Sequence, residues 1–235
     1  MSIAELRREY NLAGLRRKDL DADPLVQFRI WFEQATGARR SGRVRKLIVN
    51  TYKSLRMIRS DELIDLNALT LATVDKGGQP SVRVVLLKGI DERGFIFYTN
   101  YQSRKGRELA DNPRAALGFY WPHVERQVCV QGEVSKTTGA ESDAYFKSRP
   151  RGSRIAACAS DQSTVIGNRA ELEEKWARCE TQYKGQEVPR PSFWGGYVLK
   201  PVLFEFWQGR PNRLHDRFRY TLGKGDAWII ERISP

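Results

Sequence analysis

The segment WQGRPNRLHDRFRY, residues 207–220, carries residue types suited to binding an anionic, planar ligand. His215 is one of only two histidines in the chain, and Arg213 and Arg217 flank it. Guanidinium groups bind anions through paired hydrogen bonds, and an imidazole between two cations favours its neutral form. Trp207 adds an aromatic surface. The alternative for this segment is a solvated basic turn that leads into a strand.

Two further clusters could bind phosphate groups. In RVVLLK, Arg83 and Lys88 bracket an apolar strand and point to opposite faces of it, which suits a ligand with a flat ring and a charged tail. Ser103 is followed by Arg104 and Lys105 at the expected start of a helix, where backbone amides add to the two cations. Snorkelling surface cations and ordinary helix capping are the alternatives.

A third cluster lies in YFKSRPRGS, with Tyr145, Arg149 and Ser153. Arg149 precedes Pro150, so we expect a helix to end there and these groups to lie on a turn. Hydroxyl and guanidinium groups are common phosphate ligands, and DQS at 161–163 adds an amide and a hydroxyl in a polar loop. Two phosphate sites would suit two phosphorylated ring compounds that meet face to face.

The elements that must position these clusters are mostly β-strands. From Leu69 onward the apolar pattern has a period of two, with turns such as DKGGQP and GKGD between short runs. We expect about seven strands, and no run alternates strand with long helix as a doubly wound sheet would. The pattern favours a mainly β fold, an antiparallel barrel with peripheral helices. The predicted helices lie at residues 3–10, 24–37, 103–112, 139–148 and 169–184.

Composition limits the function classes. The formal net charge is +12, and eight positive charges fall in residues 39–59 without an acidic residue. Such a segment can bind nucleic acid, but no base-recognition motif accompanies it, which favours a solvated insertion. Three widely spaced cysteines argue against disulfides and against a zinc site, and no metal site is expected. Because no membrane span or signal peptide is evident, we expect a cytoplasmic protein.

The order of these motifs resembles that of the pyridoxine/pyridoxamine 5′-phosphate oxidases, which are FMN enzymes. SRPRGS, PRPSFWGG and RLHDR together are specific to this family. The resemblance covers nearly the whole chain except residues 38–62. The matching stretches are LRREY (6–10), GLRRKDL (14–20), DPLVQF (23–28), RVVLLK (83–88), FYTNYQSRK (97–105), ERQVCVQG (125–132), YFKSRPRGS (145–153), DQS (161–163), VPRPSFWGGY (188–197) and FWQGRPNRLHDRF (206–218).

The resemblance implies an FMN-binding split β-barrel and assigns roles to individual residues. The implied cofactor residues are Arg83, Val84, Val85, Leu86, Leu87, Lys88, Tyr98, Thr99, Arg104, Lys105, Gln127, Gln162, Ser163, Trp207 and Arg217. The implied substrate residues are Arg7, Arg8, Glu9, Tyr10, Lys88, Tyr145, Arg149, Ser153, Arg213, Leu214 and His215. Among the cofactor residues, Arg83, Arg104, Lys105 and Ser163 would hold the flavin phosphate, and residues 7–10 would form a lid over the substrate.

The implied reaction oxidises pyridoxine 5′-phosphate or pyridoxamine 5′-phosphate to pyridoxal 5′-phosphate. A hydride passes from the substrate C4′ to flavin N5, O2 reoxidises the flavin to give H2O2, and the amine substrate also releases NH3. Arg213 and His215 are the expected catalytic residues. Arg213 would position the reacting carbon, and His215 would orient the substrate and could assist proton removal.

The resemblance also implies an obligate homodimer with two active sites at the subunit interface. It divides the chain into an N-terminal helical segment and lid (1–37), a basic insertion (38–62) and a barrel domain (63–235) that includes the C-terminal dimerisation and substrate region. Three alternatives stay open at this point. They are another split-barrel flavin reductase, a non-enzymatic pyridoxal phosphate carrier without flavin, and a nucleic-acid-binding protein that uses the basic segment.

Overall fold

The computed structural model describes residues 9, 10, 12, 14–37 and 66–235. The strands are β1 (Ala68–Val74), β2 (Pro80–Leu86), β3 (Gly89–Asp91), β4 (Gly94–Asn100), β5 (Arg114–Trp121), β6 (Arg126–Lys136), β7 (Trp194–Gln208), β8 (Asp216–Leu222) and β9 (Trp228–Ile233). The helices are α1 (Pro24–Thr36), α2 (Arg104–Asp111), α3 (Gly139–Ser148), α4 (Arg151–Ala159) and α5 (Arg169–Gln182).

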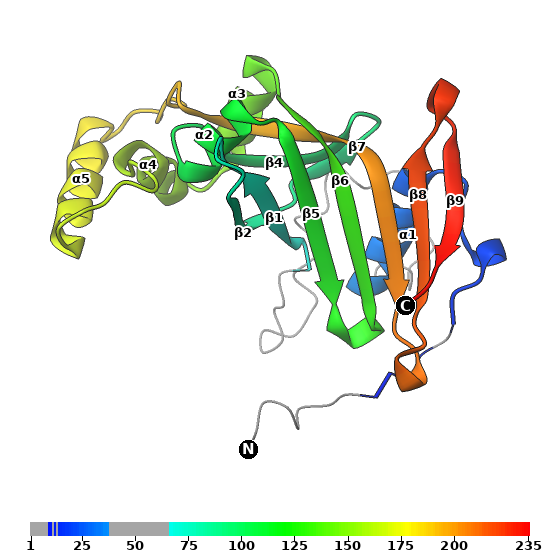
Figure 1. The fold of residues 1–235 in the computed structure, drawn as a ribbon. Coiled ribbons are helices and arrows are strands. Elements are labelled where there is room, and N and C mark those ends of the chain that lie inside the picture. Colours follow the sequence, from blue (N-terminus) through cyan, green and yellow to red (C-terminus); the bar gives the residue numbers. More distant parts are fainter. Residues whose placement is uncertain (1–8, 11, 13, 38–65) are drawn as a thin grey trace.

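The nine strands form one curled antiparallel sheet, a half-barrel with helices at its periphery (Figure 1). The strand order is β2-β1-β5-β6-β7-β4-β3, and β8 and β9 continue the sheet from β7. Helices α4 and α5 lie at one end of the molecule, and β8 and β9 lie at the other (Figure 1). The predicted mainly β, antiparallel fold is confirmed.

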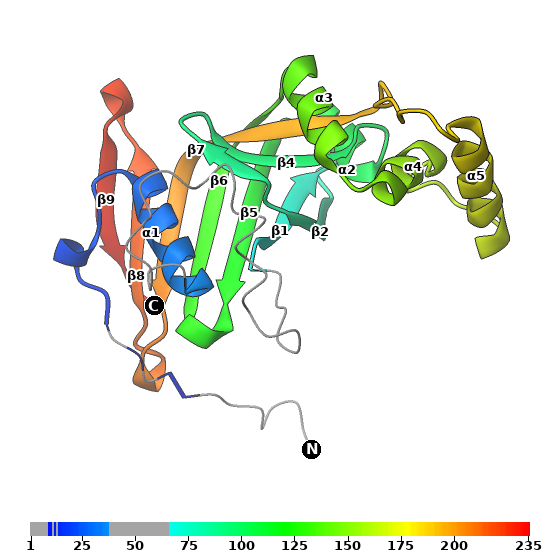
Figure 2. The same ribbon diagram turned by 180° about the vertical axis from the view of Figure 1, so that it is seen from behind.

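Helix α1 covers the inner face of the sheet (Figure 2). Asp23 caps the helix through its side chain, and Gly37 ends it with a left-handed backbone, so the bounds of α1 agree with the helix predicted at 24–37. Phe28 and Trp31 on α1 are buried in the main core. Their rings contact a layer of aromatic side chains from the strands, mostly edge to face or tilted. These partners are Phe95, Phe119, Trp121 and Phe206.

Strand β7 is 15 residues long and links the two ends of the sheet. Its first part pairs with β4 and its last part with β8. The glycines of the FWGG motif let the side chain of Tyr101 cross the strand. A Cβ added at Gly195 would lie 2.1 Å from the Tyr101 hydroxyl, so only glycine fits there.

Two local predictions were wrong. The strand expected to run from Arg83 to Lys88 ends at Leu86, and Lys88 lies at the break between β2 and β3, where its N–H donates to Ile96 O. The turn expected after Arg149 is replaced by α4, so Ser153 lies on a helix. Pro150 explains the second difference, since a proline lacks an N–H and is as suitable before a helix as after one.

Some predictions fall outside the described residues. The basic insertion at 38–62 lies there entirely, as does most of the helix expected at 3–10. The proposed division into three segments therefore stays a prediction. None of the helices in the described ranges is both long and apolar enough to cross a lipid bilayer.

Candidate functional site

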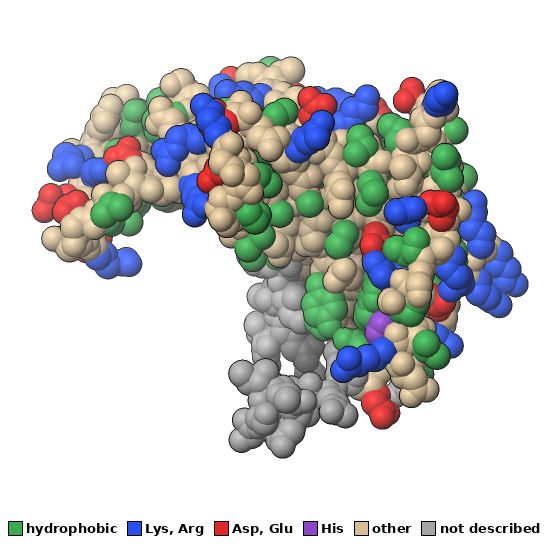
Figure 3. All heavy atoms as spheres, in the orientation of Figure 1, with side chains coloured by type: hydrophobic (Ala, Val, Ile, Leu, Met, Phe, Trp, Pro, Cys, Tyr) green, Lys and Arg blue, Asp and Glu red, His purple; other side chains and the backbone are tan. Residues whose placement is uncertain are grey.

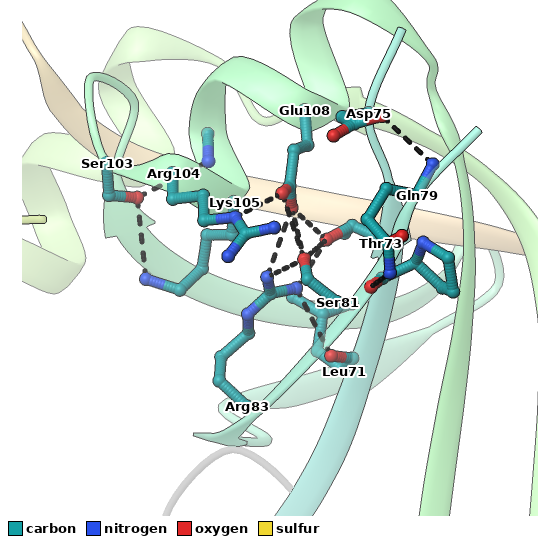
Figure 4. Close-up of polar contacts among 12 residues, drawn as sticks. Leu71, Thr73, Asp75, Gln79, Ser81, Arg83, Ser103, Arg104, Lys105 and Glu108 are labelled. Atoms are coloured by element: carbon teal, nitrogen blue, oxygen red, sulfur yellow. Dashed lines mark hydrogen bonds and ion pairs between the residues drawn. The ribbon is translucent and has the colours of Figure 1, made fainter. Parts of the chain in front are cut away.

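Three cations predicted to bind phosphate lie together beside α2, and we call them the cation cluster (Figure 4). Arg83 comes from β2, and Arg104 and Lys105 come from the first turn of α2. Ser103 caps this helix by accepting the N–H of Gly106. The helix N-terminus therefore adds positive potential to the same region.

Lys105 is buried and is held by neutral oxygen atoms. Its Nζ donates to Gln162 Oε1 (3.1 Å), Thr99 Oγ1 (3.2 Å) and Ser103 Oγ (3.4 Å). Burial lowers the pKa of Lys105, and the nearby charge of Arg83 lowers it further. An anion bound here would therefore stabilise the charged form of this lysine. The structure brings three of the predicted cofactor residues, Thr99, Lys105 and Gln162, into direct contact.

A buried carboxylate, Glu108, binds the other two cations of the cluster, and the motifs in the sequence did not predict its role. Its side chain is 5% exposed, and it accepts from Arg83 Nη2 (3.0 Å) and Arg104 Nε (2.8 Å). Hydroxyl groups of Thr73 and Ser81 also donate to it (Figure 4). Burial alone would raise the pKa of this carboxyl, but the hydrogen bonds lower it to about 2. The spacing of four residues from Arg104 was the available signal.

The charges of this region match a phosphate monoester. Three cations and one carboxylate give a formal charge of +2 (3 − 1). A phosphate monoester carries about −1.5 to −2 at neutral pH. The residues present therefore fit a ligand with a terminal phosphate group.

A second group of predicted residues surrounds three parallel rings, Tyr98, Tyr145 and Trp194, which we call the aromatic stack. The Tyr98 and Tyr145 ring centroids are 3.9 Å apart, and Trp194 lies within 11° of parallel to both rings. The Arg149 guanidinium lies over the Trp194 ring, 4.6 Å from its centroid. Burial lowers the pKa of Arg149. Among the described residues, no acceptor bonds to its buried Nη1, so this donor is available to an anionic oxygen.

A third group lies where β7 turns into β8. The rings of Trp207 and His215 have centroids 4.6 Å apart, and Tyr10 meets both edge-on. The backbone N–H of Arg210 donates to His215 Nδ1 at 3.1 Å. The neutral imidazole therefore carries its proton on Nε2, which is left as a donor.

The environment of His215 keeps it neutral. Burial lowers its pKa below the usual 6.5, and the positive charges of Arg213 and Arg217 lower it further. Arg213 is exposed and has a left-handed backbone, with φ of 60°. This conformation costs a non-glycine residue about 1–2 kcal/mol, and such strain is often found at functional sites.

Three predicted cofactor residues form one row across the sheet. Gln127 pairs with Trp207, and Trp207 pairs with Arg217. Arg217 Nε also donates to Glu205 at 2.8 Å, which fixes its guanidinium. Because directly paired residues of antiparallel strands share a face, these side chains lie on the same face of the sheet.

The cation cluster and this row lie on opposite faces of the sheet. Arg83 pairs with Leu71, and Leu71 pairs with Leu117, and both leucines belong to the buried inner face. Trp207 follows the buried Phe206 and points to the outer face. One chain therefore cannot bring Arg83 and Trp207 onto one small ligand.

The substrate residues predicted from the sequence are also divided. The aromatic stack lies at the start of β7, and the His215 loop follows its end (Figure 1). Thirteen residues separate Trp194 from Trp207, roughly 40 Å along an extended strand. The structure brings Tyr98, Tyr145 and Arg149 together but leaves Arg213 and His215 far from them in sequence and along the strand.

The remaining predicted residues are dispersed around these groups. Ser163 has a left-handed backbone in the exposed loop beside Gln162. Leu87 is buried in the core, Val85 and Leu86 are half-buried, and Val84 is exposed. Glu9 and Leu214 are exposed. Arg7 and Arg8 lie outside the described residues.

Apolar side chains are exposed on the outer face. Val82 and Val84 are 68% and 67% exposed, whereas Arg83 between them points inward. Tyr120 is exposed on the same face, and it pairs with Gln127, which belongs to the row of Gln127, Trp207 and Arg217. Hydrophobic side chains are visible on this side of the molecule (Figure 3). Apolar side chains exposed together on one face of a sheet are typical of a surface that another chain covers.

Known families and relatives match the chain along its length. A model of "Pyridoxamine 5′-phosphate oxidase" matches residues 59–183. A model of the "Pyridoxine 5′-phosphate oxidase C-terminal dimerisation region" matches residues 194–235. The pyridoxine/pyridoxamine 5′-phosphate oxidase of Cyanothece sp. is 48% identical over 235 residues, covering 100% of this chain and 99% of the relative. That of Paraburkholderia phytofirmans is 51% identical with the same coverage.

Solved structures agree with this assignment. PhzG from Burkholderia lata 383, crystallised with tetrahydrophenazine-1-carboxylic acid, has a TM-score of 0.79 at 28% identity and covers 97% of this chain and 100% of its own. A pyridoxamine 5′-phosphate oxidase-related, FMN-binding protein from Nostoc punctiforme has a TM-score of 0.63 at 16% identity, covers 92% of this chain and 100% of its own, and shows the fold alone. By its full-length similarity to named oxidases, the chain belongs to the pyridoxamine 5′-phosphate oxidase family of enzymes.

Proposed function

We propose that the protein oxidises pyridoxine 5′-phosphate or pyridoxamine 5′-phosphate to pyridoxal 5′-phosphate, with FMN as cofactor and O2 as electron acceptor. The observation that carries the proposal is a pair of separate anion-binding groups, the cation cluster and Arg149. Adjacent residues of β4 contribute to both, since Thr99 contacts Lys105 and Tyr98 joins the aromatic stack. Such an arrangement suits a phosphorylated cofactor beside a phosphorylated substrate.

The cation cluster would hold the cofactor phosphate, together with Ser163. Lys105 is already fixed by three neutral oxygens, and Glu108 fixes the two arginines. Little side-chain entropy would therefore be lost on binding. The bound flavin would supply the redox chemistry, taking a hydride from the substrate and passing the electrons to O2. Each turnover would give one H2O2, and the amine substrate would also consume water and release NH3.

Arg149, Tyr145, Ser153 and Lys88 would hold the substrate phosphate. The unpaired Nη1 of Arg149 supports this assignment, because a buried donor gains most from a charged acceptor. A substrate without an anionic group would leave this donor unsatisfied. This observation favours an anionic substrate over a neutral one such as unphosphorylated pyridoxine.

A second copy of the chain would complete each site, giving a homodimer with two active sites. The copy would supply Gln127, Trp207 and Arg217 to the cofactor, and Arg213 and His215 to the substrate ring. Gln127, Trp207 and Arg217 lie on the sheet face opposite the cation cluster, and Arg213 and His215 lie at the opposite end of β7 from Arg149. Both observations support a second copy, as does the exposed apolar outer face. Because Nε2 of His215 carries the proton, His215 would orient the substrate by donating a hydrogen bond and would not remove a proton.

Aerobic turnover of pyridoxine 5′-phosphate by the purified protein, with and without added FMN, tests the proposal. Pyridoxal 5′-phosphate that forms only with FMN, and not from unphosphorylated pyridoxine, is the expected result. A folded, flavin-bound dimer that forms no product would show that the substrate is wrong. A colourless protein that binds pyridoxal 5′-phosphate without flavin would support a carrier instead.

A further inference from the structure

We propose that Trp194 is a positioning residue, which holds Arg149 in place for the substrate phosphate without neutralising its charge. This inference rests on the proposed function, since it concerns the phosphate of that substrate. Trp194 is absent from the residues that the sequence motifs assigned to cofactor or substrate. Its role follows from how this chain holds its buried cations.

Arg83 belongs to the proposed cofactor phosphate site and Arg149 to the proposed substrate phosphate site, and the two side chains are held in different ways. Arg83 donates to the carboxylate of Glu108, which it shares with Arg104, and also to the hydroxyl groups of Ser81 and Thr73. Arg149 forms no ion pair with any carboxylate in the described part of the chain, and its guanidinium lies over the Trp194 ring instead. An aromatic face attracts a cation through its quadrupole and consumes none of its in-plane N–H donors. Arg149 therefore keeps its charge and its Nη1 donor for a ligand.

The indole of Trp194 is fixed from several sides. The side chain is 6% exposed, and the Phe146 ring meets it edge-on, 5.0 Å between centroids. Its backbone N–H donates to Pro191 O at 3.0 Å, and its carbonyl accepts from Arg190 Nη1 at 2.7 Å. Pairing with Asn100 places it as the first residue of β7. A fixed face holds the guanidinium in one plane before the ligand arrives.

Trp194 also joins the two proposed phosphate sites. Its ring is parallel to Tyr98, a predicted cofactor residue, and to Tyr145, a predicted substrate residue. The substrate phosphate lies away from the carbon that reacts, so loss of the indole should weaken binding more than it slows chemistry. The expected signature is a rise in KM with little change in kcat.

Trp194→Leu in the FMN-loaded enzyme is the principal test. A desolvated cation–π contact corresponds to roughly a 30-fold change in an equilibrium constant, so we expect KM for pyridoxine 5′-phosphate to rise about 10–30-fold. The kcat should stay within about threefold of wild type. Trp194→Phe keeps a smaller aromatic face and should restore most of the affinity.

Binding of inorganic phosphate to the FMN-loaded enzyme, measured by isothermal titration calorimetry, gives a readout that does not depend on turnover. Its Kd should rise in parallel with KM in Trp194→Leu. In an Arg149→Ala background the same change should add almost nothing, because the two residues act through one contact. Trp176→Leu on α5 is the matched control, since Trp176 is 41% exposed and touches none of these groups, and it should change neither constant.

Several results would overturn the inference. Additive effects of Trp194→Leu and Arg149→Ala on the phosphate Kd would mean that the indole acts through general packing, as would an equal fall in kcat and kcat/KM. If the leucine variant does not fold, Trp194→Met, which also lacks an aromatic face, takes its place, and an unchanged phosphate Kd rejects the role. A wild-type enzyme without turnover of pyridoxine 5′-phosphate would instead contradict the proposed function itself.

Discussion

Individual side chains in this protein show three ways to hold a cation near an anion site. Lys105 is bound by neutral oxygens, Arg83 by the carboxylate of Glu108, and Arg149 by the face of Trp194. The motifs in the sequence identified all three cations, because basic residues at strand ends and helix starts can be recognised from the sequence alone. The contacts with their partners were not predicted, since Glu108 lies on a different element from Arg83, and Trp194, although part of the PRPSFWGG motif, is distant from Arg149 in the sequence.

His215 provides a prediction at the same scale. Burial and two neighbouring arginines lower its pKa, so the imidazole is neutral at pH 7 and titrates below 6.5. Because the folded pKa is the lower one, the unfolded chain binds more protons between the two values, and stability falls as pH decreases through this window. NMR titration of the ring should show this midpoint. Arg213→Gln should move the midpoint upward, since one of the two repelling charges is removed.

A distant arginine serves as the control for that titration. Arg178 lies on α5 and is exposed, so Arg178→Gln should leave the His215 midpoint unchanged. A wild-type midpoint at or above 6.5 would contradict the prediction.

At the scale of elements, the sequence predicted best what is decided locally. Helix caps at Asp23 and Ser103 set the starts of α1 and α2 as expected, because a cap acts within one turn. The break at Lys88 and the helix start at Pro150 were missed. Both depend on which neighbour the backbone pairs with or packs against, and this information is not contained in a short window.

Helix α2 is attached to the sheet by one buried ion-pair network, which gives a prediction of stability. Glu108→Ala would leave Arg83 without its counter-charge and should lower the free energy of unfolding by about 3–5 kcal/mol in urea at pH 7. Glu108 has a folded pKa of about 2 against an ordinary 4.5. Its contribution is therefore complete above 4.5 and is lost as pH falls from 4.5 toward 2.

The same helix offers a control for this effect. Asp111 at its end pairs with the exposed Lys76, and such surface pairs contribute about 0–1 kcal/mol. Asp111→Ala should therefore leave the unfolding midpoint almost unchanged. If the two variants lost equal stability, or if the deficit of Glu108→Ala persisted at pH 2, the network would not be what fixes α2.

At the scale of the whole molecule, the exposed apolar outer face predicts an oligomer. Val82→Glu places a charge on the edge of this face without touching a predicted ligand residue. We expect a monomer by size-exclusion chromatography with light scattering, together with loss of bound flavin, because each cofactor site would then lack its second half. Leu172→Glu on α5 is the control and should stay dimeric and yellow. A Val82→Glu dimer that retains flavin would place the interface elsewhere.

The predicted site residues are divided between two faces of one sheet, and mixing two variants tests whether each site combines residues of two chains. The motifs predicted which residues would act, yet no linear pattern could show that Arg149 lies beside the start of β7 whereas Arg213 lies beyond its end. If each site combines Arg149 of one chain with Arg213 of the other, Arg149→Ala and Arg213→Ala should each be nearly inactive alone. Unfolded together and refolded as a 1:1 mixture, half of the dimers are mixed and each carries one intact site, so about a quarter of wild-type activity should return.

Two variants from the same half of the site are the control for that recovery. Arg149→Ala mixed with Tyr145→Phe should give no activity beyond the sum of the two, because every mixed site lacks one of these groups. No recovery in the Arg149→Ala and Arg213→Ala mixture, although mixed dimers form, would mean that each site is built within one chain. The extended β7 and the opposed faces make that outcome incompatible with the structure, so the mixing experiment tests the proposed site and the fold together.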